Sequence, residues 1–94
     1  NARRANAAAS ALAEGLRALP GARLLQAVEA NELFVALPES VVSALESAGF
    51  GFYRWPVAGL ASGVAIRLVT SYATEPEDTA AFLAAARAAA AEAA

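Results

Sequence analysis

The chain has 94 residues, a formal net charge of −2 and neither histidine nor cysteine, and all seven of its basic residues are arginine. Its length fits one small domain with a single core. The missing residue types exclude a side-chain Schiff base, a near-neutral base, a thiolate and a good transition-metal ligand, while the negative charge argues against nucleic acid.

The first predicted element is a helix over residues 2–19, because this stretch is rich in alanine, the strongest helix former. Its larger apolar side chains recur with helical spacing on one stripe, and these are Leu12, Leu16 and Leu19. Pro20 and Gly21 then end the helix and turn the chain. The sequence opens inside this helical pattern without a signal-peptide core, which indicates a fragment of a longer protein, with the cytosol as the default compartment.

Two short strands are predicted next, at Leu24–Val28 and Leu33–Leu37. The polar connection over residues 29–32 favours their antiparallel pairing. A second helix is expected from Pro38, with a left-handed C-terminal cap at Gly49. Its apolar stripe consists of Val41, Val42 and Leu45.

The most regular strand pattern covers Val64–Tyr72, after an aromatic, β-prone run over residues 50–55 and a loop over residues 56–63. Alternation divides this strand into two faces: Val64, Ile66 and Leu68 on one, and Ala65, Arg67, Val69 and Ser71 on the other. The last helix is expected to begin with a capping box between Thr74 and Glu77. Its predicted buried face is Phe82, Leu83, Ala86 and Ala89.

The resulting order, αββαββα, predicts an α+β two-layer sandwich with a mostly antiparallel sheet and the helices on one face. The other sheet face then stays open. If the helices cover the side that carries Ile66 and Leu68, Arg67 points out of the open face, where it could form one wall of a cleft against a second domain.

The run Arg67-Leu68-Val69-Thr70-Ser71, followed by Thr74 and a helix, resembles the C-terminal segment of low-specificity L-threonine aldolases. These are pyridoxal-phosphate (PLP) lyases of the aspartate-aminotransferase fold, fold type I. Earlier segments resemble the same family in the same order, and these are residues 12–16, 19–21, 28–35 and 48–55. The resemblance covers nearly the whole chain but only the C-terminal third of such an enzyme.

The resemblance implies that residues 1–94 form one small C-terminal domain, with residues 1–19 as the helix that leads into it. The Schiff-base lysine and the other cofactor-binding groups of the family would lie in a large domain outside this chain. Arg67 corresponds to the family's arginine that binds the substrate α-carboxylate, and Arg54 is a second candidate. The implied reaction is cleavage of L-threonine-like β-hydroxy-α-amino acids to glycine and an aldehyde.

No catalytic, cofactor-binding or metal-binding residue is therefore expected here, and the isolated chain should be inactive and bind no PLP. The expected partners are the amino-acid substrate, the large domain and further copies of the enzyme, but neither nucleic acid nor a membrane. An exposed apolar patch around Phe50, Tyr53, Trp55 and the first helix would mark the contact with the large domain.

Three alternatives stay open. From pattern alone, Arg67 is more often a surface group, and Arg54 could stack on its neighbours or simply be exposed. The chain could belong to another fold type I enzyme, such as an aminotransferase, racemase or β-eliminating lyase. It could also be a stand-alone α+β interaction or dimerisation module.

Overall fold

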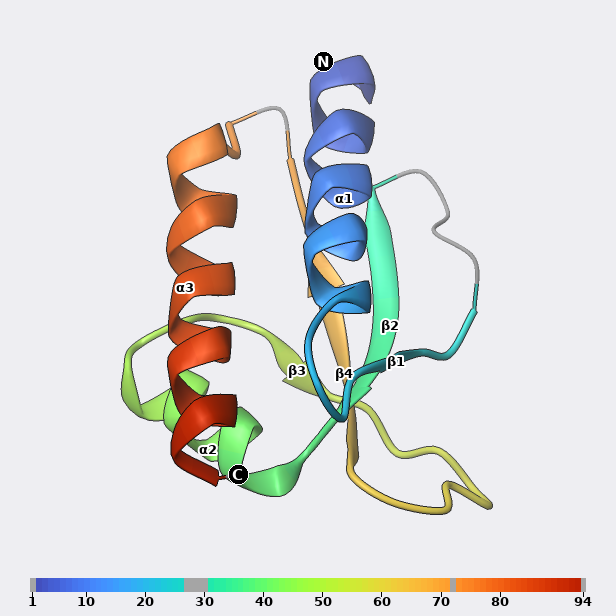
Figure 1. The fold of residues 1–94 in the computed structure, drawn as a ribbon. Helices are drawn as coiled ribbons and strands as arrows, with labels where there is room; N and C mark the ends of the chain where they lie inside the picture. Colours follow the sequence, from blue (N-terminus) through green and yellow to red (C-terminus); the bar gives the residue numbers. More distant parts are fainter. Residues whose placement is uncertain (1, 27–30, 72, 94) are drawn as a thin grey trace.

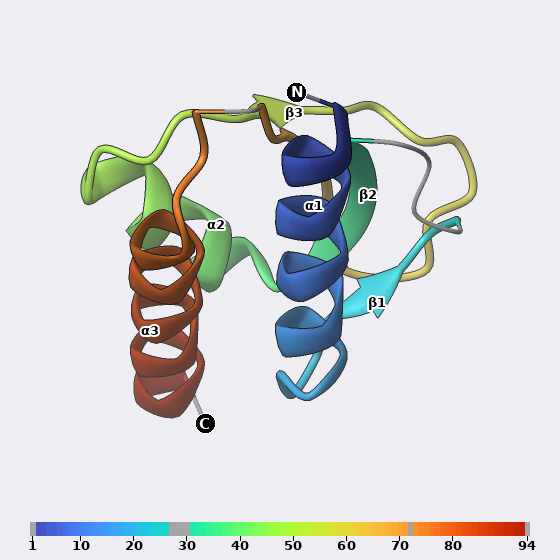
Figure 2. The same ribbon diagram turned by 90° about the horizontal axis from the view of Figure 1, so that it is seen from above.

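Three helices cover one face of a four-stranded sheet (Figures 1 and 2). The computed structural model describes residues 2–26, 31–71 and 73–93. In chain order the elements are α1 (Ala2–Arg17), β1 (Arg23–Leu24), β2 (Glu32–Leu37), α2 (Glu39–Ser47), β3 (Tyr53–Arg54), β4 (Val64–Val69) and α3 (Pro76–Ala93). This order confirms the predicted αββαββα sandwich. None of the helices in the described part of the chain combines the length and apolar character needed to cross a bilayer.

The sheet has the strand order β1-β2-β4-β3, and every neighbouring pair is antiparallel. In the central pair, Leu33 lies opposite Leu68 and Val35 opposite Ile66. All four side chains are buried beneath the helices. Because side chains alternate along a strand, Arg67 faces the other way, which confirms the predicted division of this strand into two faces.

The core lies between this sheet face and the helices. The predicted stripes of the three helices are all buried in it, but α1 ends at Arg17 and not at residue 19 as predicted, so Leu19 packs on the core from the turn that follows the helix. Helices α1 and α3 run side by side in the same direction (Figure 2). Gly15 lies where they meet, and a Cβ atom there would collide with the side chain of Leu83. The side chain of Leu83 therefore packs directly on the backbone of α1, at a position whose only visible sequence signal is a glycine inside a helical pattern.

A buried threonine joins α1 to the end of the central strand pair. The Thr70 hydroxyl donates a hydrogen bond to the Ala5 carbonyl at 2.6 Å, and the side chain is only 4% exposed. The backbone N–H of Thr70 donates to the Asn31 carbonyl at 2.8 Å, and the Asn31 side-chain amide donates to the Thr70 carbonyl at 2.7 Å. Asn31 and Thr70 thus extend the sheet ladder by one pair, so both residues have a structural role.

The predicted cap of α2 is confirmed. Gly49 has φ 95° and donates its N–H to the Glu46 carbonyl at 3.0 Å, while Phe50 donates to the Leu45 carbonyl at 3.2 Å. These two bonds form a Schellman motif, which also turns the residue after the glycine back towards the helix. The ring of Phe50 accordingly packs edge-on against Phe82 of α3, with centroids 5.3 Å apart.

The predicted capping box of α3 is wrong by one position. Pro76 is the first residue of the helix, so Glu75 is the residue that caps it. The backbone N–H of Glu75 donates to the carboxylate of Asp78 at 2.8 Å. The hydroxyl of Thr74 instead accepts the N–H of Ser71 at 2.9 Å.

Three predicted strands are shorter in the structure. Strand β1 covers only Arg23–Leu24, and residues 27 and 28 of its predicted range lie outside the described residues. Strand β3 covers only Tyr53–Arg54, because the Schellman motif holds the start of the aromatic run against the core. Strand β4 ends at Val69, and residue 72 lies outside the described residues.

Candidate functional site

The sheet face opposite the helices, here called the open face, carries three exposed large apolar residues, Tyr53, Trp55 and Val69. Tyr53 of β3 lies directly opposite Arg67 of β4 and is 64% exposed. Trp55 donates its backbone N–H to the Ala65 carbonyl at 2.8 Å, so it continues the pairing of β3 and faces the same way as Arg67. Val69 is 52% exposed on the same face.

Arg67 is held on the open face by two groups. Its Nη2 atom donates to a carboxylate oxygen of Glu32 at 2.8 Å, and the two side chains are 31% and 32% exposed. Its guanidinium carbon lies 5.7 Å from the ring centroid of Trp55, within the range of a cation–π contact. Neither partner was predicted from the sequence, because each depends on the register between strands.

A hollow of about 340 Å³ lies beside Arg67 on the open face. Its lining residues are Gly51, Phe52, Tyr53, Arg67 and Val69. Within the described part of the chain, the guanidinium contacts an acceptor through only one of its three nitrogens. The remaining donors of Arg67 suit a planar anion such as a carboxylate, which a guanidinium can hold with two parallel hydrogen bonds.

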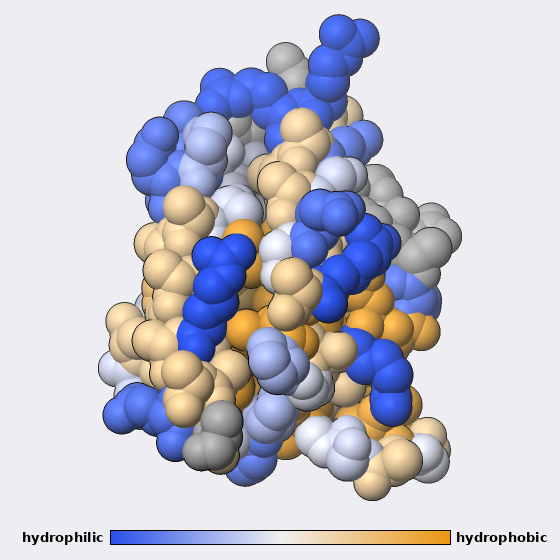
Figure 3. All heavy atoms as spheres, in the orientation of Figure 1, coloured by the Kyte–Doolittle hydropathy of each residue, from blue (hydrophilic) through white to orange (hydrophobic). Residues whose placement is uncertain are grey.

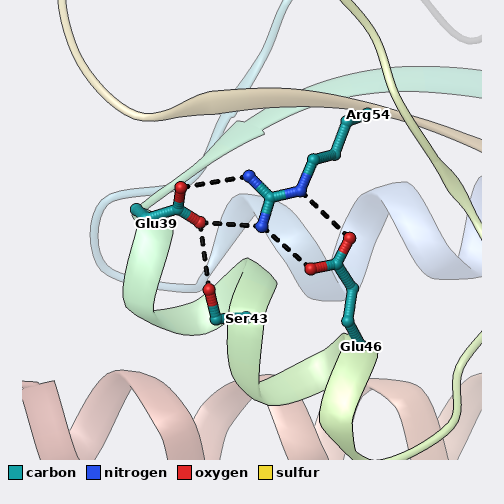
Figure 4. A network of polar contacts seen from close by, with 4 residues as sticks. All are labelled: Glu39, Ser43, Glu46 and Arg54. Carbon is teal, nitrogen blue, oxygen red and sulfur yellow. Dashed lines mark hydrogen bonds and ion pairs between the residues drawn. The ribbon is translucent and has the colours of Figure 1, made fainter.

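Arg54, the second candidate for substrate binding, lies on the opposite side of the sheet. It pairs with Ile66 and points towards α2, where two carboxylates hold it (Figure 4). Its guanidinium donates to both oxygens of Glu39 at 3.0 and 2.9 Å, and to both oxygens of Glu46 at 3.0 and 2.8 Å. Arg54 and Arg67 therefore do not converge on one site, and Arg54 neither stacks on its neighbours nor points freely into solvent.

The charges of this cluster support one another. Hydrogen bonds from Arg54 lower the pKa of both Glu39 and Glu46 below their usual value of 4.5, and the same bonds raise the pKa of Arg54. Ser43 adds a hydrogen bond from its hydroxyl to Glu39 at 3.1 Å. The cluster ties β3 to α2 and accounts for Arg54 without a ligand.

Replacing Arg54 with Met should destabilise the protein at neutral pH but much less in acid. The lowered pKa of each carboxylate means that its contribution to stability is present above about 4.5 and is lost as the pH falls through the lowered folded-state value. The unfolding midpoints of the wild type and the variant should therefore stay apart above pH 4.5 and converge as the pH falls below it. Arg87→Met, at an exposed position of α3, is the control and should give a difference that does not depend on pH. A constant difference for Arg54→Met would contradict the ion cluster.

The expected apolar patch is only partly present. Tyr53 and Trp55 are exposed on the open face, but Phe50 is half-buried against the core and does not belong to the patch. The outward side of α1 does not belong to it either. Figure 3 shows the helical side of the molecule, where weakly hydrophobic residues alternate with charged ones.

A second hollow, of about 380 Å³, lies between the N-terminal halves of α1 and α3. Its lining residues are Arg4, Ala7, Ala8, Ala11, Thr74, Pro76 and Thr79. Arg4, one of these residues, forms an ion pair with Glu75 at 3.1 Å. No group of three or more residues suited to binding a metal ion occurs among the described residues. The hollow beside Arg67 is therefore the better candidate site, because it combines a half-buried cation with aromatic walls.

No protein-family model matches the chain, and no curated protein matches its sequence. Solved structures do match. A threonine aldolase from Leishmania major has 31% sequence identity and a TM-score of 0.76 over 92% of this chain. A glycine decarboxylase (P-protein) of the glycine cleavage system has 27% identity and a TM-score of 0.74 over 94% of the chain. The aminotransferase TlmJ from Streptoalloteichus hindustanus shares the fold over 99% of the chain, with 17% identity and a TM-score of 0.73.

The chain spans only 24%, 21% and 32% of the lengths of these three proteins. A further match is a variant of the cystine C-S lyase C-DES, with glycine covalently linked to its PLP cofactor, at 18% identity and a TM-score of 0.69. The chain is therefore a small α+β domain with the fold found in segments of PLP-dependent enzymes of fold type I.

Proposed function

We propose that this chain is the small C-terminal domain of a PLP-dependent lyase of the threonine-aldolase type, in which Arg67 binds the substrate α-carboxylate. The observation that carries the proposal is the position of Arg67, half-buried beside a hollow on the open face with most of its donors free of acceptors in the described residues. The 31% identity to the threonine aldolase from Leishmania major supports this choice of enzyme.

The residues of this chain do not fit the cofactor itself. A PLP enzyme holds its cofactor through the amine of a lysine, and this sequence has no lysine. The cofactor, which supplies an electron sink when bound, would therefore be held by a part of the protein outside this chain. The contribution of this domain is to bind and orient the substrate.

Arg67 is suited to that role by its surroundings. A guanidinium offers donors in a fixed plane, so it can set the direction of a bound carboxylate as well as attract it. At 31% exposure the side chain is partly removed from water, which strengthens a charge-assisted hydrogen bond. Glu32 accepts a hydrogen bond from Nη2 alone, so Nε and Nη1 can donate to a second carboxylate.

A second candidate function is glycine decarboxylation by an enzyme of the same fold. It is supported by the 27% identity to a glycine decarboxylase over 94% of this chain. Both candidates take an amino acid that carries an α-carboxylate, so a carboxylate bound at Arg67 would not by itself distinguish them. The products formed by the complete protein would distinguish threonine cleavage from glycine decarboxylation.

The test is to purify the complete protein, record its visible spectrum and supply L-threonine. We expect absorbance from bound PLP, with glycine and acetaldehyde formed in equal amounts. Carbon dioxide released from glycine, without acetaldehyde from L-threonine, would establish the second candidate instead. A complete protein without cofactor absorbance would contradict both candidate functions, and a stand-alone interaction module would then be the remaining alternative.

A further inference from the structure

Trp55 contacts the guanidinium of Arg67 without competing for its hydrogen bonds. The ring lies 5.7 Å from the guanidinium carbon, and an aromatic face attracts a cation but accepts no strong hydrogen bond. We infer that Trp55 is a positioning residue, which holds Arg67 in the orientation that receives the substrate carboxylate. The inference rests on the function proposed for Arg67.

The ring of Trp55 is itself held in place from two directions. Its backbone N–H donates to the Ala65 carbonyl at 2.8 Å, which fixes the side of the sheet on which the ring lies. Phe34 contacts it edge-on, with the two centroids 5.5 Å apart and the planes at 65°. Since Phe34 lies directly opposite Arg67 in the β2–β4 register, the three side chains form one cluster, contributed by β2, β4 and the residue that follows β3.

Glu32 and Trp55 hold Arg67 in different ways. Glu32 accepts a hydrogen bond from Nη2 at 2.8 Å and balances its charge, so removing Glu32 would both free the side chain and expose more positive charge. These two effects oppose each other in carboxylate binding. Removing the ring of Trp55 frees the side chain and leaves every charge in place. Loss of Trp55 should therefore weaken substrate binding.

The expected size follows from the strength of a cation–π contact. With Trp55 44% exposed, the contact should change affinity by about five- to tenfold. In the complete enzyme, Trp55→Leu should raise KM for the amino acid about five- to tenfold, with kcat and the cofactor spectrum unchanged. Trp55→Phe keeps an aromatic face and should stay within about threefold of the wild type.

Two further variants separate positioning from general damage. Phe34→Leu keeps Trp55 but removes its edge contact, so it should raise KM by a smaller factor of about two. Val57→Ala removes another exposed apolar side chain, two residues after Trp55, and should leave KM unchanged. A purely structural role for Trp55 would instead lower the yield of folded enzyme without moving the KM of the folded fraction.

A double substitution decides whether Trp55 acts through Arg67. In an Arg67→Ala background, Trp55→Leu should weaken amino-acid binding no further, measured as Kd for glycine by calorimetry where turnover is too slow. The same loss in both backgrounds would overturn the inference, because Trp55 would then contact the substrate itself. If Arg67→Ala weakens binding and Trp55→Leu alone does not, the inference fails while the proposed function stands. If Arg67→Ala leaves binding unchanged, the proposed function fails and the inference fails with it.

Discussion

Replacing Arg67 with lysine in the complete enzyme is expected to lower kcat/KM by about 30- to 150-fold, equivalent to about 2–3 kcal/mol of transition-state stabilisation. Lysine keeps the charge but loses the planar pair of donors. Its single ammonium group must also serve Glu32, which already occupies one nitrogen of Arg67 at 2.8 Å. Steady-state kinetics with L-threonine measures the loss.

Arg67→Ala should lower kcat/KM further, because it leaves the substrate carboxylate without a partner in a partly desolvated site. Cofactor binding should hardly change, since the cofactor-binding groups are proposed to lie outside this chain. Arg87→Ala, at an exposed position of α3, is the matched control and should change neither quantity. The carboxylate assignment is wrong if Arg67→Ala turns over substrate at nearly the wild-type rate, or if it abolishes cofactor binding without altering substrate affinity.

The parts of the fold that follow local rules could be predicted from the sequence. Alternation in the strand around Ile66 assigned its two faces correctly, because the helices cover one face fully, whereas on the other face Ala65 is buried but Val69 is exposed. The glycine after α2 marked a left-handed cap, since φ of 95° is costly for other residues. The start of α3 was misplaced because Thr74 and Glu75 both precede a proline, and only the proline determines the first helical residue.

The contacts that depend on how distant strands and helices pair could not be predicted from the sequence. Glu32 lies opposite Val69, diagonal to Arg67, and this placement requires the β2–β4 pairing that the sequence alone did not indicate. From the sequence, Arg54 was a candidate for lining a cleft. In the structure it instead binds the carboxylates of Glu46 and Glu39 in α2, which lie 8 and 15 residues earlier in the chain. The spacing of seven between Glu39 and Glu46, two turns of a helix, was the available signal, because it places both carboxylates on one side of α2.

The same difference between local pattern and strand register applies to the site around Arg67. A residue's face on a strand follows from its own neighbours in the sequence, so the direction of Arg67 was predictable. The groups that hold a side chain come from other strands and helices. The sequence did not predict the contacts of Glu32 and Trp55 with Arg67, because Glu32 belongs to the neighbouring strand β2 and Trp55 follows β3.

The largest expected loss of stability comes from Ile66, which has no exposed surface and lies at the centre of the covered sheet face. Ile66→Ala should destabilise the 94-residue chain by about 2–5 kcal/mol, because it removes buried methyl groups and leaves a cavity in the core. This is a large share of the stability of so small a domain. Urea unfolding at 25 °C should show a lower midpoint with an unchanged slope.

The matched control is Val69→Ala, three residues further along the same strand but 52% exposed on the open face. It should cost at most about 1 kcal/mol, because little buried surface is lost and the remaining effect is strand propensity. Equal losses for the two variants would mean that both sheet faces are covered in the isolated chain, and self-association through the open face would be the first explanation to test. In the complete enzyme the same comparison becomes a probe of the open face: a larger cost for Val69→Ala there than in the isolated chain would show that the rest of the protein packs against it.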